Sequence, residues 1–93
     1  MSARSDRQAA REVVGAYHEG QLAALVDRVG AAIDNFREGQ LDAFGVDRAL
    51  FQYSRAAKEL WKFCNLGPPE ITAKIIRDQP AVDWWERGAP RRR

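Results

Sequence analysis

The first half of the chain carries one long stripe of residues at helical spacing. The stripe recurs at gaps of three or four and consists of Val14, His18, Leu22, Leu25, Val29, Ile33 and Phe36. This spacing is close to the 3.6-residue period of an α-helix, so it predicts an amphipathic helix over about 12–38. Gly39 follows at the position that tolerates a positive φ. An interior glycine costs a helix about 1 kcal/mol relative to alanine, so we expect a break or kink at Gly20.

A second apolar stripe predicts a second helix over about 47–65. We expect Asp47 to cap its N-terminus, with Val46 stapled to Phe51, and Asp42 to cap no more than a short turn in the connector. One face of this helix carries Leu50, Tyr53, Ala57, Leu60, Trp61 and Cys64. We expect this face to be buried, so that the bulky side chains around position 61 close a helical core.

Prolines divide the last third of the chain into two shorter segments. Pro69 suits the first turn of a helix over about 69–78, and a last helical turn is expected over about 81–87. Trp84 and Trp85 are adjacent and therefore point in different directions. We expect one of them in the core and the other toward a partner or a groove, so both are candidate interface aromatics.

These elements predict an all-α fold, a long antiparallel helical hairpin capped by one or two short C-terminal helices. The first helix is longer than the second, which leaves part of the first helix beyond its partner. The residues expected in this overhang are Val13, Val14, Tyr17 and His18. We expect residues 69–87 to cover them at the open end of the hairpin.

The length of 93 residues allows one domain, 1–93, with one modest core. Its basic ends, about 1–8 and 88–93, are expected to be disordered tails. No stretch approaches the roughly 20 apolar residues of a membrane span, and the N-terminus lacks the apolar run of a secretory signal. One cysteine agrees with a reducing compartment. We therefore expect a cytoplasmic protein with no membrane partner.

The net charge of +2 resides at the ends of the chain, because residues 12–86 hold 8 basic and 12 acidic side chains. An acidic folded part disfavours the broad positive footprint of a duplex-binding protein. Two nucleic-acid hypotheses stay open. One uses a segment similar to a helix-turn-helix at 55–78, with Glu70, Thr72 and Lys74 toward base edges. The other uses a basic stripe on the second helix: Arg48, Phe51, Arg55, Lys58 and Lys62.

Few residues suggest chemistry. The predicted hairpin brings His18 near Cys64, but a catalytic thiolate needs an electropositive setting and an orienting third group, which the sequence does not identify. One His and one Cys also fall short of the ligand set of structural zinc. We therefore predict no enzyme activity and no catalytic, cofactor or metal residues. We expect a buried structural cysteine at a packed junction that leaves no room for a substrate.

The run "EGQLDAFGVDRALFQYSRAAKELWKFC", residues 38–64, resembles the helical hairpin of the exonuclease VII small subunit. The shared features are a Gly-x-Leu connector, an aromatic and an alanine at mid-helix, and a Leu-x-x-x-Cys ending. The run is also similar to short uncharacterised all-helical proteins with an "ELWKFC"-like ending. Both resemblances imply a non-catalytic partner chain.

The apolar stripes are wide for a monomer, which predicts self-association. Two hairpins that pack into a four-helix arrangement are the simplest closed, symmetric solution. We therefore expect a homodimer that acts as a protein–protein interaction or accessory module, with an unidentified protein as a further partner.

Overall fold

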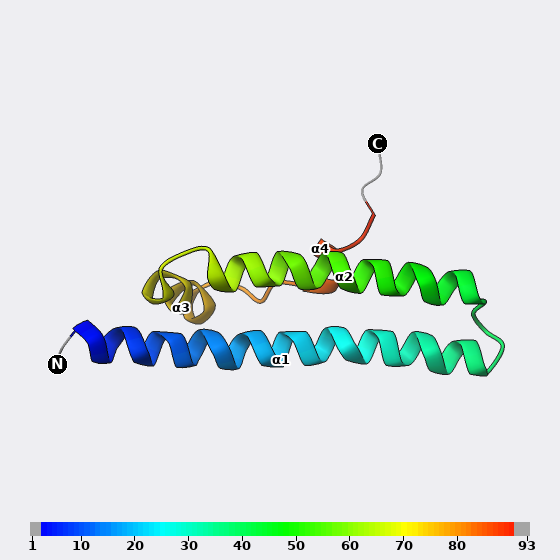
Figure 1. Cartoon of the computed structure of the whole chain (residues 1–93), viewed down its shortest axis with the longest axis horizontal. Coiled ribbons are helices and arrows are strands. Elements are labelled where there is room, and N and C mark those ends of the chain that lie inside the picture. Colours follow the sequence, from blue (N-terminus) through cyan, green and yellow to red (C-terminus); the bar gives the residue numbers. More distant parts are fainter. Residues whose placement is uncertain (1–2, 91–93) are drawn as a thin grey trace.

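The protein is a long helical hairpin with a C-terminal segment folded back along it (Figure 1). A computed structural model describes residues 3–90, and the predicted tail positions 1–2 and 91–93 lie outside them. The described residues contain no strand. The predicted all-α hairpin is thereby confirmed. Its helices are α1 (Ala3–Arg37), α2 (Ala43–Asn65), α3 (Pro69–Asp78) and α4 (Trp84–Arg87).

The first helix is longer than predicted and has no break. It begins at Ala3, so residues 3–8, which were predicted to belong to a disordered tail, are helical. It also continues through Gly20, where a kink was expected. The buried Val14 and Leu25 flank that glycine in the core, and their packing holds the helix straight across it.

The connector is short because α2 begins four residues earlier than predicted. Asp42, not Asp47, is the N-cap: its side chain accepts a hydrogen bond from the backbone N–H of Gly45 at 2.8 Å. Leu41 lies against Gly45 at a position where a larger residue would collide with it. Gly39 ends the first helix with φ 80, as the sequence predicted.

Because α2 begins early, the pairing register of the two long helices differs from the predicted one. Tyr17 was expected to lie beyond the end of α2, yet its ring packs on Phe63 with 5.9 Å between ring centroids. The remaining overhang of α1 is covered by α3, where Arg7 and Glu70 form an ion pair of 3.9 Å. The prediction that this part of the chain caps the open end is therefore correct for α3.

The prediction is wrong for α4, which lies against the middle of α2 and not at its end (Figure 1). After α3 the chain runs back along one side of the hairpin without helical structure until Asp83. The carboxylate of Asp83 accepts a hydrogen bond from the backbone N–H of Glu86 at 3.2 Å, so the last helix begins at Trp84 and not near position 81.

The core lies where α1, α2 and α4 meet. Leu60 and Ala56 are completely buried there. The indole N–H of Trp84 donates to the hydroxyl of Tyr17 at 2.8 Å, and its ring lies 5.4 Å from that of Phe63. The remaining buried residues of this cluster are Val14, Leu25 and Cys64. Trp84 thus fastens the C-terminal segment to both long helices.

The chain after α4 is also held in place, although positions 88 and 89 were predicted to be part of a tail. Arg55 donates from Nε to the carbonyl of Gly88 at 2.6 Å. A Cβ atom at Gly88 would lie 2.5 Å from the carbonyl oxygen of Gln52 and 2.6 Å from the nitrogen of Ala56. The close approach of α4 to α2 therefore requires glycine at this position.

Two glycine-to-alanine substitutions test this packing with opposite expected signs. Gly88→Ala should lower the free energy of unfolding by about 1–3 kcal/mol, because the added methyl group must push α4 off α2. Gly20→Ala should raise it by about 0.5–1 kcal/mol, because no atom lies within 4 Å of its Cβ and alanine favours the helix. Urea denaturation followed by circular dichroism, at one protein concentration, measures both. Equal stability of Gly88→Ala and the parent would contradict the described packing of α4.

Candidate functional site

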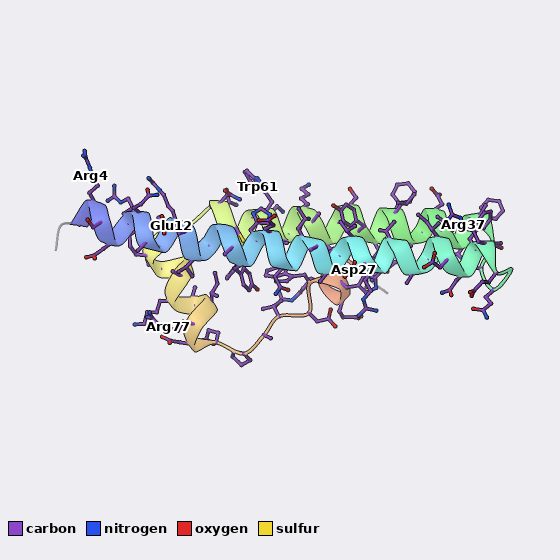
Figure 2. The ribbon with its side chains drawn as sticks, turned by 90° about the horizontal axis from the view of Figure 1, so that it is seen from below. Arg4, Glu12, Asp27, Arg37, Trp61 and Arg77 are labelled. Atoms are coloured by element: carbon purple, nitrogen blue, oxygen red, sulfur yellow. The ribbon has the colours of Figure 1, made fainter. Side chains whose placement is uncertain are left out.

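One side of the hairpin is covered by the C-terminal segment, and the other side is open. Figure 2 shows α3 and α4 on one side of the two long helices, while Trp61 points to the opposite side. The large apolar side chains that are about half exposed include Val26 (51%), Phe36 (47%), Leu50 (46%) and Trp61 (52%). Together with Ile33 and Val46, which line a groove beside Phe36 and Leu50, these four form what we call the open face.

The open face corrects the prediction that one buried stripe runs along α2. Leu60 and Cys64 are buried as expected, but Trp61 and Leu50 are not. The apolar arc of α2 covers two neighbouring directions, one toward α1 and α4 and one toward the open side. Ala56, which the predicted stripe omitted, is completely buried because Gly88 lies against it. Trp61 therefore does not close the core.

A groove lies in the open face at the connector end of the hairpin. Its volume is about 380 Å³, and it is formed between α1 and α2. Its apolar walls are Ile33, Phe36, Ala43, Val46 and Leu50, and its charged residues are Arg37 and Asp47. Such a surface can hold an apolar side chain and offer its polar atom a hydrogen-bond partner.

A second hollow, of about 350 Å³, lies beside His18 and Cys64 near the start of α3. Its other lining residues are Arg11, Val14, Gly15, Asn65, Gly67 and Pro69. The structure thus brings His18 and Cys64 to one place, as the hairpin predicted, but the junction is not filled as we expected. Tyr17 is turned away from this hollow, toward Trp84.

Burial determines the state of the thiol in this hollow. Desolvation raises the pKa of Cys64 above its ordinary value, so the thiol is protonated at neutral pH. A nucleophilic cysteine requires the opposite shift.

Within residues 3–90, no group of three or more His, Cys, Asp or Glu side chains is placed to hold a metal ion. No helix of that part of the chain has the length and apolar character of a membrane span.

The basic stripe on α2 is partly engaged within the chain. Arg55 is bonded to Gly88, and Lys62 forms an ion pair of 3.6 Å with Glu59. Phe51 is 59% exposed, so the predicted staple does not cover it. Arg87 joins Arg55 and Lys58 around a pocket of about 320 Å³, which Glu59 also lines, so the positive side chains extend from α2 to the C-terminal segment. The sequence analysis missed this extension because it expected the segment that contains Arg87 at the open end of the hairpin and not beside Arg55.

Of the other candidate residues, Thr72 and Trp84 are buried, whereas Glu70 and Lys74 are exposed. Thr72 is buried, and Glu70 is paired with Arg7, so the part of α3 that would face bases in a helix-turn-helix packs against α1. Trp84 is 5% exposed and belongs to the core. Trp85 is half-buried, with the guanidinium of Arg28 5.7 Å from its ring centroid. The tryptophan with an exposed side chain is Trp61.

Comparisons with known protein families, with curated proteins and with solved structures found no match to the chain. The resemblance of residues 38–64 to the exonuclease VII small subunit stays a prediction.

The state of Cys64 can be tested by alkylation. In the folded protein at pH 7, iodoacetamide should modify the thiol at least tenfold more slowly than in 6 M guanidinium, because burial hinders access and keeps the sulfur protonated. The reaction should accelerate only at a higher pH than for an exposed cysteine. Mass spectrometry of the intact chain over time measures the rate. Rapid modification of the folded protein at neutral pH would restore the thiol-enzyme hypothesis.

Proposed function

We propose that the protein is a non-catalytic helical interaction module that self-associates through its open face. The observation that carries this proposal is the open face, with its four half-exposed apolar side chains and the groove beside two of them. Contiguous apolar patches on soluble chains mark interaction sites. A hairpin supplies two helices, and a second copy completes the four helices of a bundle.

The size of the open face supports a second copy as the occupant. Along the 23 residues of α2 the hairpin is roughly 35 Å long, and two helices side by side are about 20 Å wide. The resulting footprint is on the order of 700 Å², close to the roughly 800 Å² per partner of a standard interface. The protonated state of Cys64, the one thiol of the chain, supports a role without covalent catalysis.

The mixture of charges around the open face supports the same occupant. Asp47 and Arg37 line the groove, and Lys58 and Lys62 follow on α2. A face that contains both signs can match a copy of itself, whereas a face of one sign would repel it.

Self-association can be measured by sedimentation equilibrium over micromolar to millimolar concentrations. The parent chain should form a dimer. Leu50→Glu should raise the dissociation constant at least tenfold, because it buries a charge in an apolar interface. Leu66→Glu is the matched control, since Leu66 is 69% exposed just after α2 and is not part of the open face. A parent chain that is monomeric throughout this range would refute the proposal.

Nucleic-acid binding is a second candidate function, and the extended basic surface favours it. Arg55, Lys58 and Arg87 surround one pocket, and the sequence continues after Pro90 with three arginines. Positive side chains that gather along one helix can contact a phosphate backbone. The surrounding acidic residues make this candidate weaker than self-association.

A salt series tests this second candidate. If the basic surface binds single-stranded RNA or DNA, fluorescence anisotropy should show an affinity in 20 mM salt that falls steeply as salt rises. Lys58→Glu should lower that affinity at least tenfold and reduce the salt dependence, whereas Lys74→Glu on α3 should change it less. The absence of binding in dilute salt would eliminate this candidate.

A further inference from the structure

The open face has a projection near one end and a hollow near the other. Trp61 projects near the C-terminal end of α2, and the groove lies beside Asp47 near its N-terminal end. Ser54 is the middle residue of α2 and is seven residues from both. Seven residues are about two helical turns, so all three lie on one side of α2, with the projection and the hollow roughly 10 Å to either side of Ser54.

The same midpoint can be located on α1. Tyr17 packs on Phe63 across the hairpin. Because the helices are antiparallel, counting nine residues along each from this contact places Val26 level with Ser54. Val26 is on the open side of α1, seven residues before Ile33 of the groove.

We infer that two copies pair face to face in antiparallel orientation, with Trp61 of each copy inserted into the groove of the other. This inference rests on the proposed self-association and adds its geometry. The two-fold axis lies between the two copies at the level of Val26 and Ser54. Rotation about it places the projection of each copy opposite the hollow of the other. The contact then forms twice, as an isologous interface requires.

The groove fits an indole chemically as well as by position. Its walls are apolar, and a buried tryptophan removes about 150–250 Å² from water. The indole N–H needs an acceptor when it is buried, and the carboxylate of Asp47 is part of the groove. The tryptophan that appeared to belong to the core of one chain thus completes the core of a pair.

Charges agree with this pairing. Asp47 of one copy lies opposite the turns of α2 that carry Lys58 and Lys62 in the other. Arg37 lies opposite the stretch of α1 between Glu12 and Glu19. Charges of opposite sign meet in both places, although exposed pairs of this kind steer association more than they strengthen it.

The alternative symmetric pairing places the two connectors at the same end, with α1 over α2 of the other copy. Arg37 would then lie opposite Ala43, about one helical turn from Asp47, so charge alone does not choose between the two orientations. Shape does, because in that arrangement the groove faces the other groove and Trp61 lies at the same end as its counterpart. The antiparallel pairing fills both hollows.

Disulfide trapping distinguishes the two orientations. In the antiparallel pair, Ser54 lies beside Ser54 of the other copy, and Val26 lies beside Val26 of the other copy. Ser54→Cys alone and Val26→Cys alone should therefore each give a covalent dimer under mild oxidation. In the alternative pair neither variant should link alone, and a mixture of the two should give a mixed dimer. The parent chain, whose Cys64 is buried, is one control. Asp27→Cys is the second, since Figure 2 shows Asp27 on the side of α4.

The outcomes separate this inference from the proposed function. Linking of each single variant, with no linking of the controls, is the expected result. A mixed dimer without single-variant dimers would overturn the orientation but leave self-association intact. A parent chain that sediments as a monomer would overturn the proposed function, and the inference with it.

A double-mutant cycle tests the contact of Trp61 with the groove. Trp61→Ala and Phe36→Ala should each weaken dimerisation at least tenfold. Within one chain these residues are about 25 Å apart along the hairpin, so any coupling between them must cross the interface. In the antiparallel pair the double variant should be at least fivefold less impaired than the product of the single effects. If the effect of the double variant on the dissociation constant equals the product of the two single effects, Trp61 is not inserted into the groove.

Discussion

The docking of Trp84 against Tyr17 and Phe63 is the contact on which the rest of the structure depends. It joins residues 67 positions apart in sequence and combines a hydrogen bond with ring packing in one place. A bare two-helix hairpin buries too little apolar surface to be stable alone. Trp84 adds the C-terminal segment as a third element of the core, and Gly88 allows this segment to pack closely on α2.

This docking makes the two sides of the hairpin unequal. The side under the C-terminal segment contains the fully buried positions, Ala56 and Leu60. The opposite side keeps Leu50, Trp61 and the connector groove, which have no covering layer in a single chain. This asymmetry of the hairpin is the physical basis of the proposed self-association.

The sequence allowed most of the fold to be predicted, because apolar spacing, Gly39 and Pro69 are local signals that act within one helix. It did not determine which of two aspartates, five positions apart, caps the start of α2. Asp42 and Asp47 are chemically equivalent candidates, and the choice depends on how Leu41 packs on Gly45. The predicted start of α2, four residues too late, followed from that choice.

The candidate site was harder to predict than the fold. Helical spacing shows how wide the apolar arc of α2 is, but which part of the arc is covered depends on where residues 79–90 lie. Trp61 was expected in the core and is at the surface for this reason, whereas Trp84 is the member of the Trp84–Trp85 pair that enters the core. No local signal in the sequence places α4 at mid-hairpin.

The position of α4 also bears on how the chain acquires its structure during synthesis. Its docking surface is made of α1 and α2 together, so it does not exist until both have emerged from the ribosome and paired. The residues of α4 that complete the core are translated after both long helices. Until then the nascent hairpin exposes apolar surface on both of its sides, and this interval is when it is most exposed to chaperones and to premature contact with neighbouring chains.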